Sequence, residues 1–323
     1  MAEVCVQSPQ GYDIIGDVHG CADALVRLLD KLGYHEINGV FCHPHRQAIF
    51  AGDILDRGPG IREALAIVKR MCDAGYARMI MGNHEFDAIG YHTKAPADSG
   101  RNYLREHTER HTRLIAETLA QFEDHPQEWQ DYLAWFKSLP LFIEHPNFRV
   151  VHAYWDQPLI DEMITRYGGP CINDDFIAAT ADQTSFEWRC ISRLTRGADL
   201  PLPEGHAMVS AEGFERRSFR ARFWGRKPKT YGELAFQPDP LPEHIASQPL
   251  EPNDDFQLVR YGRNERPLFV GHYWLSGRPA PVTDNLACLD YSAVKYGRLV
   301  AYSFDNETQL DANKYTWVHV DNP

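Results

Sequence analysis

The sequence has no long apolar run and no paired cysteine motif. None of its apolar stretches approaches the roughly 18–20 residues that a membrane-spanning helix needs, and residues 1–10 lack the basic start and apolar stretch of a secretory signal. The seven cysteines are an odd number and none are spaced Cys-x-x-Cys, which argues against a disulfide framework and against structural zinc. We therefore expect a cytoplasmic protein with reduced thiols and no membrane partner.

Basic residues are also scarce: 33 Lys and Arg stand against 45 Asp and Glu, a net charge of −12. This surplus opposes strong general binding to nucleic acids or anionic membranes. It does not exclude a phosphate-bearing substrate, because a local metal cluster can outweigh distant surface charge. With 43% hydrophobic and 24% charged residues, the 323-residue chain has the composition of a soluble globular protein.

The first ninety residues repeat one pattern three times: a short apolar strand, a polar Gly-Asp or Gly-Asn turn, and a helix. The strands are expected at Tyr12–Ile15, Ala48–Ala51 and Met79–Met81. This alternation predicts parallel β-α-β units in an α/β fold. Ligands of such sheets collect where the strands end, which is where these polar turns lie.

The rest of the chain is less regular. We expect a helical insertion at 95–140 and a cap insertion at about 171–260, with a loop over Pro238–Pro252, all within a single domain spanning 1–323. Short strands are expected at Phe148–Val151 and Leu268–Val270, each followed by a histidine. Three C-terminal stretches, 286–291, 298–304 and 315–320, have the pattern of antiparallel strands.

Six side chains at these strand ends are candidate metal ligands: Asp17, His19, Asp53, Asn83, His152 and His272. Two close divalent ions need oxygen and nitrogen ligands and a carboxylate able to bridge them. Taken singly, an aspartate after a strand is more often a helix cap, and a lone histidine is more often a core or surface residue. Together, the motifs Asp-x-His, Gly-Asp-x-x-Asp-Arg-Gly and Gly-Asn-His-Glu leave little room for chance and predict a two-metal site for phosphate hydrolysis.

These three motifs resemble those of the binuclear metallophosphoesterases in the phosphoprotein-phosphatase (calcineurin-like) superfamily. The resemblance covers residues 12–92 and recurs at Val151-His152-Ala153, Gly271-His272 and Cys288-Leu289-Asp290. The Gly271-His272 segment is nearest to the bacterial diadenosine tetraphosphatase and polynucleotide phosphatase branch. The resemblance implies a four-layer α/β/β/α metallophosphoesterase sandwich, with an inserted cap region and the metals above the sheet edge.

The resemblance also implies a role for each matched residue. Asp17 and His19 would hold the first ion, Asp53 would bridge, and Asn83, His152 and His272 would complete the second site. His84 matches the general acid, Asp56 the carboxylate that orients it, and Arg57 the residue that grips the phosphate oxygens. The chemistry agrees, because the metals lower the pKa of water, an imidazolium protonates the leaving oxygen, and guanidinium offers a planar fork to two oxygens.

Two further features have alternative interpretations. Related sequences commonly have glycine two residues after the histidine that matches His152, whereas Tyr154 stands here, and Tyr273-Trp274 follows His272. Tyr154 and Trp274 either stack a flat leaving group or only pack beneath the ligand loops. The stretch Ser218-Phe219-Arg220-Ala221-Arg222-Phe223 alternates with period two. It is either an exposed amphipathic strand or a cap strand whose Arg220 and Arg222 bind a second phosphate.

We therefore expect a hydrolase that cleaves phosphate esters or phosphoanhydrides by attack of a metal-bridging hydroxide, acting on nucleotides or other small phosphorylated molecules. A protein Ser/Thr phosphatase is the alternative, and a non-catalytic phosphatase-like scaffold is a remote one. Carboxylate, imidazole and amide ligands suit manganese, our first choice for the two divalent ions, with iron, zinc or nickel as alternatives.

Overall fold

The computed structural model describes residues 9–209, 215–237, 241–250 and 258–321. Its largest sheet has the strand order β15-β16-β1-β4-β5, and β17 pairs with β16. The strands are β1 (Gly11–Ile15), β4 (Arg46–Phe50), β5 (Ala77–Met79), β15 (Asp290–Tyr291), β16 (Arg298–Phe304) and β17 (Tyr315–His319). As the strand–helix alternation predicts, β1, β4 and β5 are parallel, whereas β16 is antiparallel to β1.

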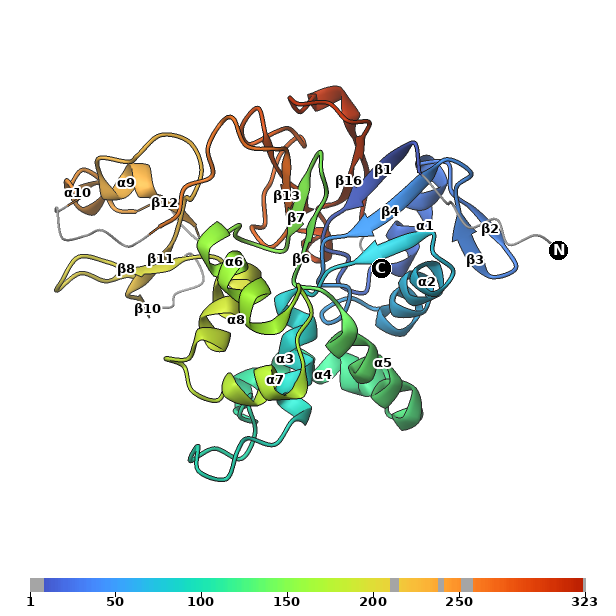
Figure 1. Ribbon diagram of the computed structural model, residues 1–323, viewed down its shortest axis with the longest axis horizontal. Helices are drawn as coiled ribbons and strands as arrows, with labels where there is room; N and C mark the ends of the chain where they lie inside the picture. The colour runs from blue at the N-terminus through green and yellow to red at the C-terminus, as the bar shows by residue number, and fades with distance from the viewer. Residues whose placement is uncertain (1–8, 210–214, 238–240, 251–257, 322–323) are drawn as a thin grey trace.

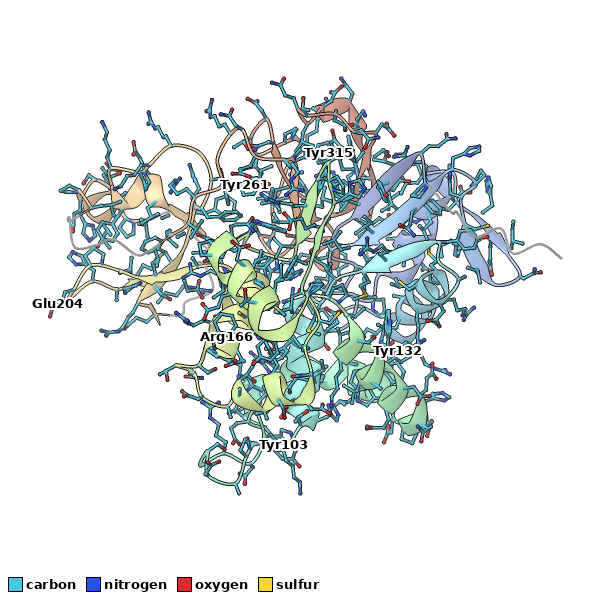
Figure 2. The ribbon with its side chains drawn as sticks, in the orientation of Figure 1. Tyr103, Tyr132, Arg166, Glu204, Tyr261 and Tyr315 are labelled. Atoms are coloured by element: carbon cyan, nitrogen blue, oxygen red, sulfur yellow. The ribbon has the colours of Figure 1, made fainter. Side chains whose placement is uncertain are left out.

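A second sheet has the order β14-β13-β7-β6. Its strands are β6 (Phe142–Glu144), β7 (Arg149–Val151), β13 (Leu268–Val270) and β14 (Leu286–Cys288). The two sheets share a core of buried side chains that includes Ile14, Ile49 and Val300 from the first and Val150 and Phe269 from the second. Tyr315 of β17 belongs to the same core and is labelled in Figure 2. The fold is therefore mixed α/β.

The C-terminal expectation was wrong in one part. The stretch 286–291 does not form one antiparallel strand, because β14 pairs in parallel with β13 and only β15 pairs antiparallel with β16. Leu289 lies between the two strands, so the chain passes here from the second sheet to the first. The strand expected at Met79–Met81 also begins earlier, at Ala77, since Ile80–Gly82 already belong to the turn before the next helix.

Amphipathic helices flank the first sheet. In α1 (Ala22–Lys31), Leu25, Leu28 and Leu29 form one buried stripe, and the helix contacts β16 and β17. Helix α2 (Ile61–Asp73) packs on α1 and β5. The other long helices are α3 (Asn83–His92), α4 (Glu109–Gln121), α5 (Pro126–Ser138), α6 (Gln157–Tyr167) and α8 (Phe186–Arg196). No helix of the described ranges is long and apolar enough to cross a membrane.

The segment 171–260, which shows no clear period in sequence, contains regular structure. Helices α7 (Asp174–Ala179) and α8 are followed by a three-stranded sheet in the order β12-β11-β8, formed by β8 (Asp199–Pro201), β11 (Ser218–Ala221) and β12 (Ala235–Gln237). The remaining elements are the pair β9 (Met208–Val209) and β10 (Glu215–Arg216), α9 (Tyr231–Leu234) and α10 (Glu243–Ala246). The small sheet lies at the opposite end of the molecule from the hairpin β2 (His35–Ile37) and β3 (Val40–Cys42) (Figure 1).

The loop expected over Pro238–Pro252 is described only in part. Residues 238–240 and 251–252 lie outside the described residues, and α10 occupies the middle of the segment.

Candidate functional site

The six predicted ligands all follow strand ends: Asp17 and His19 after β1, Asp53 after β4, Asn83 after β5, His152 after β7 and His272 after β13. Parallel neighbours end at the same edge of a sheet, and β7 and β13 are parallel neighbours, as are β1 and β4. Residues up to 255 positions apart in sequence are thereby brought into contact, as where the backbone N–H of His272 donates to Oδ2 of Asp17.

The turns that carry these side chains have unusual backbone geometry. Six non-glycine residues of the site have positive φ: His19 (45°), Asp53 (54°), Asp56 (66°), Arg57 (72°), His272 (68°) and Trp274 (42°). They make up most of the ten such residues in the described ranges. Positive φ costs roughly 1–3 kcal/mol per non-glycine residue and is concentrated at functional sites. The strain indicates that the fold holds these side chains in place for a purpose other than stability.

Glycines at two positions let the ligand loops approach closely. A Cβ added at Gly82 would lie 2.2 Å from Oδ1 of Asp53, and one at Gly271 would lie 2.1 Å from Oδ1 of Asp17. Any other residue at either position would therefore push a predicted ligand away.

Asp53 lies at the centre of the site. Its Oδ2 is 3.2 Å from Nε2 of His152, 3.8 Å from Nε2 of His19 and 3.9 Å from Nε2 of His84. It belongs to two groups whose potential ligand atoms lie within 4.8 Å of one another, His19–Asp53–His84 and Asp53–His152–His272. All these residues are buried. One carboxylate shared by two donor clusters is the arrangement that a bridging ligand requires.

Two of the histidines have their ring orientation fixed by backbone carbonyls. Nδ1 of His19 donates to the carbonyl of Leu55 at 2.9 Å, and Nδ1 of His152 donates to the carbonyl of Ala51 at 2.7 Å. Since Nδ1 is engaged by the carbonyl, Nε2 of each ring faces Asp53. Such outer hydrogen bonds are typical of histidines that bind metals.

Asn83 and His272 lie on the other side of Asp53. Oδ1 of Asn83 is 2.9 Å from Nδ1 of His272 and 3.3 Å from Nε2 of His152. Nε2 of His272 is buried with no hydrogen-bond partner among the described residues. Asp17 accepts from the backbone N–H of His272 at 3.1 Å and is not part of either donor cluster.

The buried charges shift each other's pKa. Burial alone would raise the pKa of Asp53, but His152 and His84 hold it well below its usual range. Burial would lower the pKa of His152, yet Asp53 and Asp17 raise it to about 10. The pKa of Asp17 is raised well above its usual range by burial and by Asp290. The site thus favours a positive charge between Asp53 and His152, which a proton or a metal ion can supply.

A second chain of contacts leads away from the centre through His84. Its Nδ1 is 2.6 Å from Oδ2 of Asp56, and Oδ1 of Asp56 accepts from the hydroxyl of Thr118 at 2.5 Å. Burial would lower the pKa of His84, but Asp53 and Asp56 raise it above its usual value. Nη2 of Arg57 lies 3.0 Å from Nε2 of His84. The sequence indicated His84, Asp56 and Arg57 but not Thr118.

Glu85 was also without a predicted role, although it belongs to the Gly-Asn-His-Glu motif. It is fully buried and accepts from the backbone N–H groups of Gly82, Asp53 and Ile54, each at 2.9 Å. Burial and the nearby Asp53 raise its pKa to about 7. Glu85 therefore ties the turn after β4 to the turn after β5.

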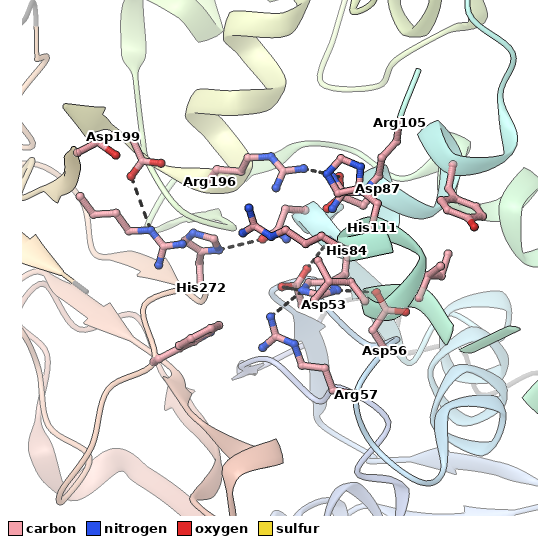
Figure 3. A pocket seen from close by; sticks show the side chains of 18 of the residues that line it. Asp53, Asp56, Arg57, His84, Asp87, Arg105, His111, Arg196, Asp199 and His272 are labelled. Carbon is pink, nitrogen blue, oxygen red and sulfur yellow. Dashed lines mark hydrogen bonds and ion pairs between the residues drawn. The ribbon is translucent and has the colours of Figure 1, made fainter. Parts of the chain in front are cut away.

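A cavity of about 440 Å³ opens beside these residues (Figure 3). Asp53, Asn83, His84 and His272 lie on its floor side, and α4 and β11 also contribute to its lining. The segments expected as insertions at 95–140 and 171–260 thus both contribute to its wall. In Figure 3, Arg196 and Asp199 lie above His272, and Arg57 lies below Asp53.

Arg220 lines this cavity, but Arg222 does not. Ser218 of β11 and Arg216, which ends β10, also line it. A register shift between Arg220 and Ala221 interrupts the alternation of β11, and the guanidinium of Arg222 lies 6.0 Å from the ring centre of Phe236. Of the predicted pair Arg220 and Arg222, the structure therefore places Arg220 at the cavity and Arg222 outside its lining.

The two predicted aromatic residues, Tyr154 and Trp274, also differ in whether they reach the cavity. Tyr154 is fully buried, and its hydroxyl donates to the carbonyl of Val259, so it packs beneath the ligand loops and cannot stack a substrate. Trp274 is 39% exposed and lines the cavity. The guanidinium of Arg57 lies 4.9 Å from its ring centre. Only Trp274 is placed to contact a ligand.

The chain is similar to known proteins in sequence and in fold. The calcineurin-like phosphoesterase family matches residues 12–176, just over half of the chain. The asymmetrical bis(5'-nucleosyl)-tetraphosphatase PrpE of Halalkalibacterium halodurans is 47% identical over 74 residues, 23% of this chain and 30% of that protein. Its namesake from Oceanobacillus iheyensis is 31% identical over 148 residues, 44% of this chain and 54% of that protein.

The matched segments thus span between 30% and 54% of the length of these relatives. A solved protein serine/threonine phosphatase from Saccharomyces cerevisiae aligns over 99% of this chain and 87% of its own, with 14% identity and a TM-score of 0.49. From the extent of the family match and the motifs within it, the chain belongs to the calcineurin-like phosphoesterase family.

Proposed function

We propose that this protein is a metal-dependent hydrolase of phosphate esters or phosphoanhydrides. One observation carries the proposal: a single buried carboxylate, Asp53, is shared by two donor clusters. Asp17 and His19 would hold one ion with Asp53, and Asn83, His152 and His272 would hold the other. The two ions would lower the pKa of a bound water towards neutrality and offset the charge of a phosphate.

The residues present fit two such ions. Nδ1 of His152 is occupied by the carbonyl of Ala51, so its Nε2 lone pair faces Oδ1 of Asn83 at 3.3 Å. Two acceptors at this distance repel each other unless a cation or a proton lies between them. Nitrogen, carboxylate and amide donors together suit manganese, which we propose for activity in vitro, with iron, zinc or nickel as alternatives.

The remaining site residues have roles that follow from their contacts. His84, with its pKa raised beside Asp53 and Asp56, retains a proton that it can deliver to the leaving oxygen. Asp56 holds its ring in one orientation through Nδ1. Arg57 lies against the Nε2 atoms of His19 and His84 and can turn its fork to the phosphate oxygens.

We further propose that the substrates are nucleotides, above all dinucleoside polyphosphates. The two relatives described above are named bis(5'-nucleosyl)-tetraphosphatases. The net charge of −12 disfavours long polyanions, whereas the arginine-lined cavity suits a compact one. A cytoplasmic location agrees with the six described cysteines, which are all unpaired.

A hydrolysis screen with added manganese tests both proposals. It would follow the two nucleotides that one cut of a dinucleoside polyphosphate forms, and the phosphate or nitrophenol released from nucleotides, phosphopeptides and nitrophenyl phosphate, with and without chelator. We expect metal-dependent hydrolysis that is fastest for dinucleoside polyphosphates. Phosphopeptides hydrolysed at least as fast would instead favour a protein Ser/Thr phosphatase, and hydrolysis of no substrate would favour a scaffold.

A further inference from the structure

The cavity beside the donor clusters contains more positive than negative side chains. Six arginines line it: Arg57, Arg105, Arg110, Arg196, Arg216 and Arg220. Four aspartates line it: Asp53, Asp56, Asp87 and Asp199. At least two guanidinium groups therefore lack a carboxylate of their own within the cavity.

The contacts identify which arginines are already neutralised. Nη1 of Arg105 donates to Oδ1 of Asp87 at 2.6 Å, and Arg196 bonds to the same oxygen. Arg220 has its Nε 3.9 Å from Asp199. Asp53 and Asp56 are engaged by the histidines of the site. All four aspartates that line the cavity are therefore already engaged by these arginines or histidines.

Three cavity arginines have no carboxylate partner among the described residues: Arg57, Arg110 and Arg216. Arg57 lies against His19 and His84. The side chains of Arg110 and Arg216 make no hydrogen bond or ion pair with any residue in the described ranges, and Nε of Arg216 is buried without a partner. They come from different elements, since Arg110 lies in the first turn of α4 and Arg216 ends β10. Two like charges that share one cavity repel each other, and a bound anion with several oxygens would relieve this repulsion.

Within the described ranges, Arg110 and Arg216 make no hydrogen bond or ion pair with a donor-cluster residue. Arg57 is the cavity arginine that lies against histidines of the site, with Nη1 3.3 Å from Nε2 of His19 and Nη2 3.0 Å from Nε2 of His84. Arg216 and Arg220 belong to different strands, β10 and β11, which are separated by a bend at Arg217 and lie in different sheets. An anion held by Arg110 and Arg216 would therefore be a different group from the phosphate held at Arg57 and the donor clusters.

We propose that Arg110 and Arg216 form an outer phosphate subsite, which binds a phosphate of the substrate other than the one attacked. The inference rests on the proposed hydrolase function and makes its substrate class more specific: molecules with a chain of linked phosphates. Nucleoside polyphosphates and inorganic polyphosphates share this chemistry, and the experiment distinguishes them.

The test uses two variants and two matched controls. Arg216→Gln and Arg110→Gln remove the charge but keep a polar side chain. Arg217→Gln makes the same change one residue further on, where the side chain is 77% exposed and paired with Glu215. Arg113→Gln makes it one helical turn from Arg110, at an exposed position outside the cavity lining.

The kcat/KM of each manganese-loaded variant would be measured for a dinucleoside tetraphosphate, for inorganic tripolyphosphate and for nitrophenyl phosphate. Each cavity variant is expected to lower the ratio of tetraphosphate to nitrophenyl phosphate kcat/KM about tenfold or more, the usual effect of losing one charge-assisted hydrogen bond. The controls should change this ratio less than about twofold. A loss on the dinucleotide alone assigns the subsite to nucleotides, and a loss on tripolyphosphate as well assigns it to the phosphate chain itself.

The inference is overturned if Arg216→Gln and Arg217→Gln change the ratio equally, since the effect would then come from net charge. A second measurement does not depend on turnover: the Kd of a methylene-bridged triphosphate analogue should rise in both cavity variants and in neither control. If the wild-type protein hydrolyses none of these substrates, the hydrolase proposal is refuted. The comparison of Kd values would still decide whether the subsite exists.

Discussion

Thr118 provides the sharpest test of the proposed proton donor, because it touches neither a ligand nor His84. Its hydroxyl donates to Oδ1 of Asp56 at 2.5 Å, while Oδ2 of Asp56 holds Nδ1 of His84 at 2.6 Å. Thr118→Val keeps the branched shape of the side chain and removes only the donor. A hydrogen bond to a charged group is worth about 1.5–3 kcal/mol, and the buried carboxylate oxygen would have no replacement.

We expect Thr118→Val to lower the free energy of unfolding by about 1.5–3 kcal/mol in denaturant melts. It should also slow hydrolysis of alkyl phosphates about tenfold more than that of nitrophenyl phosphate, because a good leaving group hardly needs an acid and general acid catalysis contributes typically 10²–10⁴-fold. Thr118→Ser, which keeps the hydroxyl, should restore most of the difference. Thr112→Val is the control, since Thr112 lies on the same helix and its hydroxyl is 3.0 Å from the hydroxyl of Tyr91, away from Asp56.

Equal losses on both phosphates in Thr118→Val would refute the reasoning. The helix would then support the fold without orienting His84.

Four further changes test the rest of the site. Asp53→Asn should abolish two-metal occupancy, measured by elemental analysis, together with turnover; full metal content with full activity would rule out a bridging carboxylate. His84→Asn should keep the metals bound but slow alkyl phosphates by about 10²–10⁴-fold and nitrophenyl phosphate far less, and equal losses would show that it is not the acid. Glu85→Gln places an amide where three backbone N–H groups need acceptors. The free energy of unfolding, measured in denaturant melts, should therefore fall by about 1–3 kcal/mol, and an unchanged free energy of unfolding would contradict this. Arg220→Ala should raise KM for a dinucleoside polyphosphate about tenfold, whereas Arg222→Ala, whose side chain turns away, should not; indistinguishable variants would place neither arginine at the substrate.

The sequence was sufficient to predict that the six candidate ligands lie together, because each one follows the end of a strand. A parallel strand fixes where its own end lies, so Asp53 and His152 converge once the strands are recognised. Thr118 could not be identified from the sequence, because it does not follow a strand. It is separated from Asp56 by 62 residues and lies on a helix whose docking depends on packing, and a lone threonine in a helix carries no pattern of its own.

The cap strand shows how one local irregularity defeats a pattern that is otherwise correct. Period-two alternation predicts Arg220 and Arg222 on one face, and that prediction holds only while the register is regular. The register shift between Arg220 and Ala221 breaks this alternation, and Arg222 does not line the cavity. The parallel pairing of β14 was missed for a similar reason, since an apolar triplet such as Leu286–Cys288 has no feature that distinguishes its partner strand.

Helix α4 links the two properties that we propose for the cavity. Near its C-terminal end, Oε1 of Gln121 accepts from the backbone N–H groups of Ile61 and Arg62 at 2.8 and 3.2 Å, the first residues of α2, where the preceding Gly60 provides no side-chain cap. Thr118 lies one turn before this anchor and is held firmly. Arg110 lies eight residues before Thr118, about 12 Å along the helix axis. One helix therefore carries both Thr118, which bonds to the Asp56 partner of the proposed proton donor, and Arg110, at the proposed outer subsite.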